Sequence, residues 1–290
     1  MGKYAIISYL DDVSAFKQLL YCRGIGRRFS ESLTEAARVC GTDIIIRRLP
    51  LNRTKGRSGC VNKFLADLLE ENYSAVFISS ALRGNEEVYR ILSEKLVLCS
   101  GEAVLEHYYC EIFNKFLFIN NKIPEEAEAV IMADDPLRAY NLITRISRSV
   151  KNVYLCVNNK KSFEMLVNDI YDELGFYVYL SESISEFLKP GRIYVNLARN
   201  TDFFINEIMN ENVSMLNLSG VCGNSGTFLN TACFGISTEF KDMIRYTKYF
   251  DQEFLEFIIT AVNNNFNERV MKQFISDYKV KFKKICLKNY

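Results

Sequence analysis

The sequence has no tryptophan and only one histidine, His107, among its 290 residues. A metal site with two histidine ligands is therefore excluded, and we expect no metal centre. A Ser-His-Asp or Cys-His catalytic arrangement would depend on His107 alone. His107 lies beside two tyrosines in a predicted helix, where a histidine is more often packed or solvated than catalytic. The sequence thus argues against both classes of hydrolase.

Cysteine pairs of the Cys-x-x-Cys type and zinc-ligand spacings are also missing, although the chain has nine cysteines. No apolar run approaches the roughly 18 residues of a membrane-spanning helix. The formal net charge of +1 gives no overall field that would attract nucleic acid or an anionic membrane. We therefore expect a cytoplasmic protein with reduced thiols that binds neither nucleic acid nor a membrane.

The chain does contain enough apolar material for a sizeable core, with 49% hydrophobic and 24% charged residues. Between residues 129 and 198, short apolar runs alternate with segments of helical periodicity. The expected strands are 129–133, 152–157, 176–180 and 192–197, and the expected helices are 136–149 and 160–174. Gly175 stands where the second helix should end. This pattern predicts a Rossmann-like parallel sheet whose ligand crevice lies at the carboxyl ends of the strands.

The remaining pattern divides the α/β chain into three expected parts. An N-terminal α/β domain covers 1–125, the Rossmann-like domain covers 126–238, and C-terminal helices that pack back on the domains cover 239–290. In the first part, the expected strands are 4–10, 43–49, 75–78, 95–99 and 112–120, and the expected helices are 12–22, 33–41, 60–71, 86–92 and 101–108. The aromatic-rich C-terminal helices are also a candidate surface for homo-oligomerisation.

The loop after the first Rossmann strand lacks glycine, which dinucleotide-binding folds use there to approach a pyrophosphate. It reads Asp134-Asp135-Pro136-Leu137-Arg138-Ala139. Carboxylates at a helix N-terminus suit the helix dipole, and proline suits the first helical position. The loop therefore predicts a well-capped helix, whereas a pyrophosphate placed there would be repelled.

The end of the second Rossmann strand favours a cofactor more. Asn158 is followed by Lys160 and Lys161, and the acidic residue that would hydrogen-bond an adenosine ribose is absent. The two lysines could meet the 2′-phosphate of NADP, or they could be a solvated pair in the first turn of a helix. The glycine-dense loop at 220–227 also has two interpretations. Gly223 and Gly226 would let a ligand approach the backbone closely, or the loop could be an ordinary series of turns.

The layout resembles that of the shikimate and quinate dehydrogenases along most of the chain. Ser30-Glu31-Ser32-Leu33 resembles the serine pair that binds substrate in that family, Val157-Asn158-Asn159-Lys160 is similar to its Asn-Arg-Thr/Ser stretch, and Asn196-Leu197-Ala198 is similar to its Asn-Ala-Thr segment. The resemblance implies NADP as cofactor. Where the family has its catalytic Lys, however, this chain has Ser79-Ser80-Ala81-Leu82-Arg83, and Asn120-Asn121-Lys122 stands in place of Asn-Thr-Asp.

Two hypotheses follow. The first is a small-molecule-binding protein on a degenerate dehydrogenase scaffold, with its ligand in the cleft between the domains. Its substrate-binding residues would be Ser30, Ser32, Ser79 and Asn196. The alternative is an active NADP-dependent oxidoreductase with an unusual cofactor loop. Its cofactor-binding residues would be Asn158, Lys160, Lys161, Gly223 and Gly226.

Overall fold

The structure is a computed structural model that describes residues 2–9, 34–49, 58–79, 82, 86–96, 98–198, 215–219, 231–235 and 251–286. The chain forms two compact units. Unit 1 comprises residues 1–101 and 235–281, and unit 2 comprises residues 102–234 and 282–290. The division at 125/126 and 238/239 that the sequence suggests stays a prediction.

Unit 1 is built on a four-stranded sheet in the order β2-β3-β1-β4. The strands are β1 (Tyr4–Tyr9), β2 (Thr34–Val39), β3 (Thr42–Leu49) and β4 (Ala75–Ile78). β1 lies between β3 and β4 and is parallel to both, whereas β2 is antiparallel to β3. The β2–β3 turn places Gly41 at φ +79°, a left-handed conformation that glycine adopts without strain.

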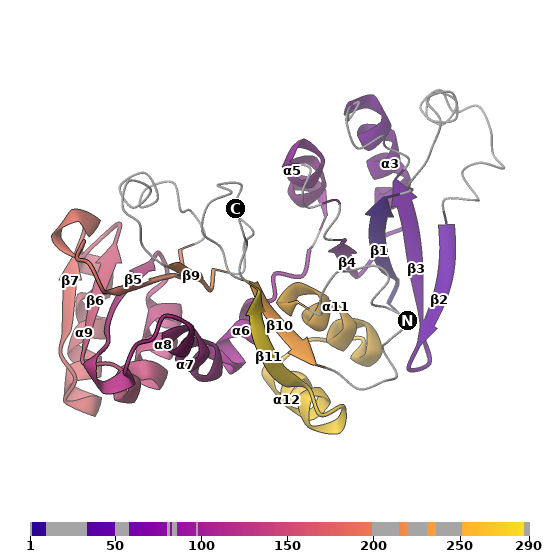
Figure 1. The fold of residues 1–290 in the computed structure, drawn as a ribbon. Coiled ribbons are helices and arrows are strands. Elements are labelled where there is room, and N and C mark those ends of the chain that lie inside the picture. The colour runs from indigo at the N-terminus through magenta and orange to yellow at the C-terminus, as the bar shows by residue number, and fades with distance from the viewer. Residues whose placement is uncertain are drawn as a thin grey trace. The chain divides into compact units, whose positions relative to one another are not determined.

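Helices cover both faces of the unit 1 sheet (Figure 1). They are α3 (Ser58–Glu70), α5 (Glu86–Lys95) and α11 (Gln252–Asn263), and α12 (Glu268–Asp277) packs on α11. On one face, α3 and α5 pack on alternate strand residues such as Ile7 and Val76. On the other face, α11 packs on β4, with the rings of Phe77 and Phe254 4.8 Å apart between centroids.

Unit 2 contains a wholly parallel five-stranded sheet in the order β7-β6-β5-β8-β9. The strands are β5 (Glu128–Ala133), β6 (Asn152–Val157), β7 (Val178–Ser181), β8 (Ile193–Asn196) and β9 (Met215–Asn217). The chain moves outward from β5 in one direction and then returns to β8 on its other side, so the switch point lies between β5 and β8. The α/β class and the Rossmann-like sheet expected from the sequence are confirmed.

The helices of unit 2 are α6 (Glu102–His107), α7 (Tyr109–Ile119), α8 (Pro136–Ile146) and α9 (Lys161–Leu174). Short 3-10 helices are η1 (Pro124–Glu126), η2 (Ser147–Ser149) and η3 (Ile184–Glu186). α8 packs against both α7 and α9, and Gly175 ends α9 at φ +63°, as expected. β10 (Thr231–Gly235) and β11 (Lys281–Cys286) form a separate two-stranded ribbon (Figure 1).

Four expected elements are wrong. In place of the expected strand at 95–99, Lys95 ends α5 and Leu98 makes only an isolated bridge with Val76. The expected strand at 112–120 is the helix α7, which buries Ile112, Phe113, Phe116 and Leu117 at helical spacing. The expected helix at 33–41 is the strand β2 and its turn, because the β2 side chains alternate in exposure against β3. The helical pattern expected through 285 ends with α12, after which β11 is extended.

The expected helix at 12–22 lies outside the described residues. No helix in the described part of the chain combines the length and the apolar composition that crossing a bilayer would require.

Candidate functional site

The carboxyl edge of the unit 2 sheet is where open α/β sheets generally bind ligands, and here the first loop is capped by its own side chain. Asp135 Oδ1 accepts hydrogen bonds from the backbone amides of Leu137 at 2.9 Å and Arg138 at 3.3 Å. The capped helix predicted from the sequence is confirmed. Two of the amides that could have met a pyrophosphate at the start of α8 are therefore occupied.

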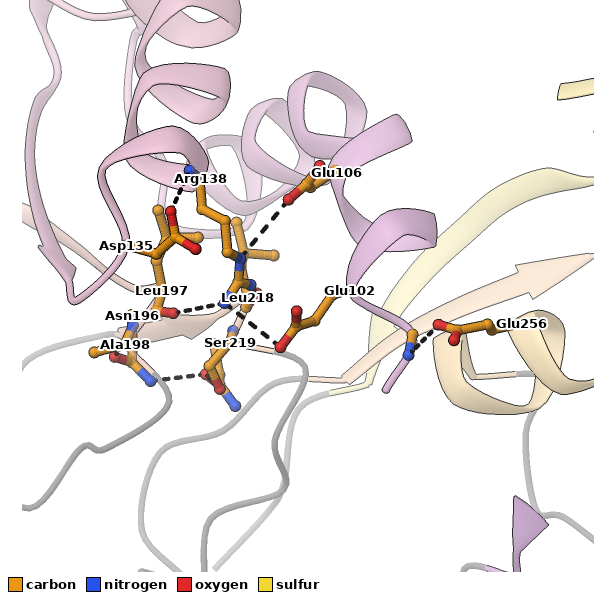
Figure 2. A network of polar contacts seen from close by, with 12 residues as sticks. Glu102, Glu106, Asp135, Arg138, Asn196, Leu197, Ala198, Leu218, Ser219 and Glu256 are labelled. Atoms are coloured by element: carbon orange, nitrogen blue, oxygen red, sulfur yellow. Dashed lines mark hydrogen bonds and ion pairs between the residues drawn. The ribbon is translucent and has the colours of Figure 1, made fainter. Parts of the chain in front are cut away.

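Arg138 belongs to the first turn of α8, and its side chain lies at the switch point of the sheet (Figure 2). Its side chain is 5% exposed, and its guanidinium donates from Nη1 to the carbonyl oxygen of Leu197 at 3.0 Å and from Nη2 to that of Leu218 at 2.8 Å. These two carbonyls follow the ends of β8 and β9. The guanidinium thus bridges the start of α8 and the residues that follow β8 and β9.

Two carboxylates from α6 neutralise this cation. Glu102 Oε1 lies 3.6 Å from Arg138 Nη1, and Glu106 Oε1 lies 3.7 Å from Arg138 Nε. Burial raises the pKa of Glu106 above its usual value, against the opposing effect of Arg138 and Arg145. Arg138 and the two glutamates therefore form a buried ionic network, which links α6 and α8 to the ends of β8 and β9.

Asn196 lies at the end of β8, as predicted, but its side-chain amide forms hydrogen bonds with other residues of the protein. The residue is 2% exposed; its Nδ2 donates to Asn217 Oδ1 at 2.9 Å and its Oδ1 accepts from the Ala198 amide at 3.1 Å. Asn217 Oδ1 also accepts from the amide and hydroxyl of Ser219. Substrate binding by Asn196 stays a prediction, and a ligand would have to replace these bonds.

The predicted cofactor residues of β6 lie exposed beyond its carboxyl end. Asn158, Lys160 and Lys161 all have exposed side chains. The Lys160 amide donates to Glu182 Oε1 at 2.7 Å, so a carboxylate from the segment after β7 occupies the start of α9. Glu182 was not predicted at this site, although it stands two residues after the expected strand 176–180 and directly follows β7. This carboxylate would oppose a 2′-phosphate beside the two lysines.

The carboxyl edge of the unit 1 sheet has two buried polar atoms without a hydrogen-bond partner among the described residues. At the same edge of the unit 2 sheet, Arg138 Nε also makes no hydrogen bond to a described residue, but it faces the Glu106 carboxylate at 3.7 Å. Ser79 directly follows β4 and is 1% exposed. Its amide donates to the Ile7 carbonyl at 2.8 Å, but its hydroxyl oxygen makes no hydrogen bond in the described part of the chain. The same holds for Oε1 of Gln252, which is 6% exposed at the start of α11.

The direction of α11 places Gln252 at the same edge as Ser79. At the far end of the helix, Asn264 Oδ1 accepts from the Gly2 amide at 3.3 Å and from the Tyr4 hydroxyl at 3.1 Å. Both donors belong to the amino end of β1, so α11 runs antiparallel to the parallel strands. A 12-residue helix is about 18 Å long, which carries its first residue to the carboxyl edge.

Gly101 fixes the first turn of α11. Its amide donates to Glu256 Oε2 at 2.6 Å (Figure 2). A Cβ atom at this position would lie 2.4 Å from Gln252 Cγ and 2.7 Å from the Gln252 carbonyl carbon, and φ is +72°. Only glycine suits both the conformation and the contact. The Gln252 side chain is therefore held by close backbone packing, a signal that the sequence alone did not reveal.

The sequence also singled out five other residues. Ser30, Ser32, Gly223 and Gly226 lie outside the described residues. His107 ends α6, and its ring packs edge-to-face on Tyr108 with centroids 4.8 Å apart. Among the described residues, no group of three or more His, Cys, Asp or Glu side chains could hold a metal ion.

No family model matches the sequence, and no curated protein matches it. Solved structures that resemble the chain include shikimate dehydrogenase 1 from Peptoclostridium difficile, with 10% identity, coverage of 96% of this chain and 98% of that chain, and a TM-score of 0.33. The catalytic subunit of M. jannaschii aspartate transcarbamoylase has 12% identity, coverage of 96% and 87%, and a TM-score of 0.31. L-tryptophan dehydrogenase from Nostoc punctiforme has 8% identity, coverage of 95% and 88%, and a TM-score of 0.32. The expected resemblance to shikimate dehydrogenases is thus present but weak, at the level of layout, and it assigns no role to any residue.

Proposed function

We propose that the chain is a small-molecule-binding protein whose ligand binds at the carboxyl edge of the unit 1 sheet through Ser79 and Gln252. The observation that carries this proposal is the pair of buried polar atoms, Ser79 Oγ and Gln252 Oε1, that make no hydrogen bond in the described part of the chain. Leaving such an atom buried costs about 1–3 kcal/mol, so natural proteins usually pair it. A ligand would supply the missing partners.

The two atoms restrict the chemistry of that ligand. Gln252 Oε1 can only accept, so the ligand must offer a hydroxyl or an N–H group, whereas the Ser79 hydroxyl can donate or accept. Asp251 and Glu253, which flank Gln252, are 5% exposed. Their carboxylates disfavour an anion nearby. We therefore expect a molecule without negative charge that bears a hydroxyl or an amine group.

The internal bonds at the carboxyl edge of the unit 2 sheet favour a protein that binds a ligand but does not carry out conventional hydride transfer. Asp135 occupies the first amides of α8, and Arg138 binds the carbonyls beyond β8 and β9. A dinucleotide that bound there in the usual way would have to break both arrangements. The absence of Lys and Asp at the positions that the dehydrogenase resemblance would assign points in the same direction.

A thermal-shift screen of polyols, sugars and amines tests this proposal. A ligand at 100 times its dissociation constant should stabilise the wild type by about 2.7 kcal/mol. Ser79→Ala and Gln252→Met should each abolish the shift. The matched controls, Ser93→Ala and Gln273→Met, alter exposed side chains that bond only within their own helices, and should keep it. Hits that stabilise Ser79→Ala and Gln252→Met as strongly as the wild type would refute the site.

The alternative, an active NADP-dependent oxidoreductase, is favoured by the exposure of Lys160 and Lys161 at the end of β6. NADP should then stabilise the wild type, the stabilisation should disappear in Lys160→Ala, and reduction of NADP should be measurable by absorbance with a suitable alcohol. Because Glu182 lies at the same helix start, we expect no NADP-dependent shift in either protein.

A further inference from the structure

Unit 2 also has a pocket at the opposite end of its sheet, where β5 and β8 begin. Its volume is about 370 Å³, within the range of small-molecule sites. The charged lining comes from the segment after α7, the start of β5 and the turn before β8. The charged residues and the turn glycine are Lys122, Glu126, Glu128, Lys189, Gly191 and Arg192.

Arg192 is the best-fixed cation of this pocket. Its side chain is 10% exposed, and its Nε donates to Glu128 Oε2 at 2.8 Å. Nη1 donates to the Phe187 carbonyl at 2.8 Å, and the guanidinium carbon lies 3.7 Å from the centroid of the Tyr154 ring. Nη2 makes no hydrogen bond to any described residue and is not sealed from solvent. The guanidinium is therefore held in place with one donor group available to a ligand.

Lys122 and Lys189 add positive charge to the pocket. Neither forms an ion pair with a carboxylate in the described part of the chain. Lys122 Nζ lies 3.5 Å from the position that a Cβ atom of Gly191 would occupy. Gly191 has φ +89°, so the turn that carries Lys189 can approach Lys122 without a side chain between them. Lys122 also follows the C-terminus of α7, where the helix dipole favours a cation, so the argument depends mainly on Arg192.

The acidic residues do not cancel this charge. Glu128 accepts hydrogen bonds from Arg192, Asn152 and Tyr154, and although burial opposes the effect, these bonds lower the pKa of Glu128. Glu128 is thus already engaged. Glu126 alone remains to offset the two lysines.

We propose that this pocket binds a phosphate-bearing small molecule, with Arg192 Nη2, Lys122 and Lys189 as the groups that contact the phosphate. A fixed guanidinium with a free donor suits phosphate oxygens, and two mobile ammonium groups can adjust around a tetrahedral anion. The site lies at the amino end of the strands and shares no residue with Ser79 or Gln252. It is therefore independent of the function proposed above.

Titration with inorganic phosphate at constant ionic strength, with chloride as the replaced anion, tests the pocket. The readout is the backbone amide resonance of Gly191 in a two-dimensional NMR spectrum, together with calorimetry. We expect saturable binding that weakens at least tenfold in the Lys122→Gln/Lys189→Gln double variant. A Lys3→Gln/Lys95→Gln double variant makes the same charge change at two exposed residues of unit 1 and should bind as the wild type does.

Two outcomes would overturn the proposal. One is an equal loss in both double variants, which would show that phosphate responds to overall charge alone. The other is a Gly191 resonance that does not move or does not saturate. Both lysine pairs reach solvent, so all variants should fold, and their melting temperatures confirm this before the titration.

Discussion

The unit 2 sheet is wholly parallel and the unit 1 sheet is mixed, and the polar groups at the carboxyl ends of their parallel strands are bonded differently. In unit 2, Asp135 caps α8, and Arg138 bonds to two strand-end carbonyls. Arg138 Nε makes no hydrogen bond to a described residue, but it faces the Glu106 carboxylate. In unit 1, Ser79 Oγ and Gln252 Oε1 are equally buried but make no hydrogen bond to any described residue. A polar group that is satisfied within the protein stabilises the fold, whereas one left unpaired reduces stability and is available for binding.

This difference suggests a division of labour within one chain. Unit 2 keeps the strand order of a Rossmann-like sheet but uses its switch point for internal bonds. Unit 1 retains unused hydrogen-bonding capacity at the corresponding edge of its own sheet. The fold of unit 2 therefore does not locate the ligand, because function depends on the atoms at a site and not on the sheet that presents them.

The largest expected effect comes from breaking the internal network of unit 2. Arg138→Met removes the guanidinium that pairs with Glu102 and Glu106, although Arg145 stays near Glu106. It also leaves the Leu197 and Leu218 carbonyls without this donor. Removing one partner from a buried ion pair costs about 3–5 kcal/mol, so we expect the free energy of unfolding in urea to fall by that amount. Arg148→Met, at an exposed residue of η2, should change it by less than about 0.5 kcal/mol. A small loss in Arg138→Met would show that the crevice of unit 2 is not held closed by this network.

A smaller effect is expected at the cap of α8. Asp135→Ala removes the acceptor for the Leu137 and Arg138 amides and should cost about 1 kcal/mol in the free energy of unfolding. Asp135→Asn keeps an oxygen in the same place and should cost a few tenths at most. If both variants lose the same amount, the charge of Asp135 matters more than its hydrogen bonds.

The features that the sequence predicted correctly are those determined by local pattern. The apolar runs around 129–198 became the parallel strands, Gly175 became a left-handed helix end, and Asp135 became a cap. Each depends on residues close together in the chain. The same local information placed Lys160 and Lys161 beyond the end of β6.

The errors occurred where tertiary contacts decide the outcome. The α7 segment is rich in Phe and Ile, which favour strands, yet its helix is stabilised by burying those side chains. β2 depends on its pairing with β3 across the turn at Gly41. Arg138, Glu182 and Gln252 were not assigned their roles, because those roles depend on groups from 22 to 151 residues away. Leu218 is 80 residues from Arg138, Lys160 is 22 from Glu182, and Gly101 is 151 from Gln252.

Two carboxylates at opposite edges of unit 2 should respond to pH in opposite directions. Burial raises the pKa of Glu106 above its usual value of 4.5. The stability that the protonated carboxyl contributes is therefore present below that pH and is lost as the pH rises through the raised pKa. Burial opposes ionisation of Glu128 as well, but hydrogen bonds from Arg192, Asn152 and Tyr154 outweigh it and lower the pKa. The stability that the Glu128 carboxylate contributes is therefore present above the usual value of 4.5 and is lost as the pH falls through the lowered pKa.

The glutamine variants measure this contrast. Relative to the wild type, the free energy of unfolding of Glu106→Gln should be higher at pH 7 than at pH 4. That of Glu128→Gln, relative to the wild type, should be lower at pH 7 than at pH 4. Urea unfolding of the three proteins at both pH values gives the two differences. Changes of the same sign would indicate that overall charge, and not the local surroundings, controls both carboxylates.

The smallest expected effect is the most informative about unit 1. Ser79→Ala removes a buried hydroxyl that makes no hydrogen bond to the described residues, so the free energy of unfolding of the unliganded protein should stay the same or rise by up to about 1 kcal/mol. Gln252→Met, which keeps the length of the side chain, should behave in the same way. A loss of more than about 1 kcal/mol in urea would mean that Ser79 already has a partner within the protein. The contrast between the two edges would then disappear, because both units would use their strand-end polar groups for their own stability. An unchanged or increased stability combined with loss of ligand binding would instead show that unit 1 gives up stability to keep these atoms available.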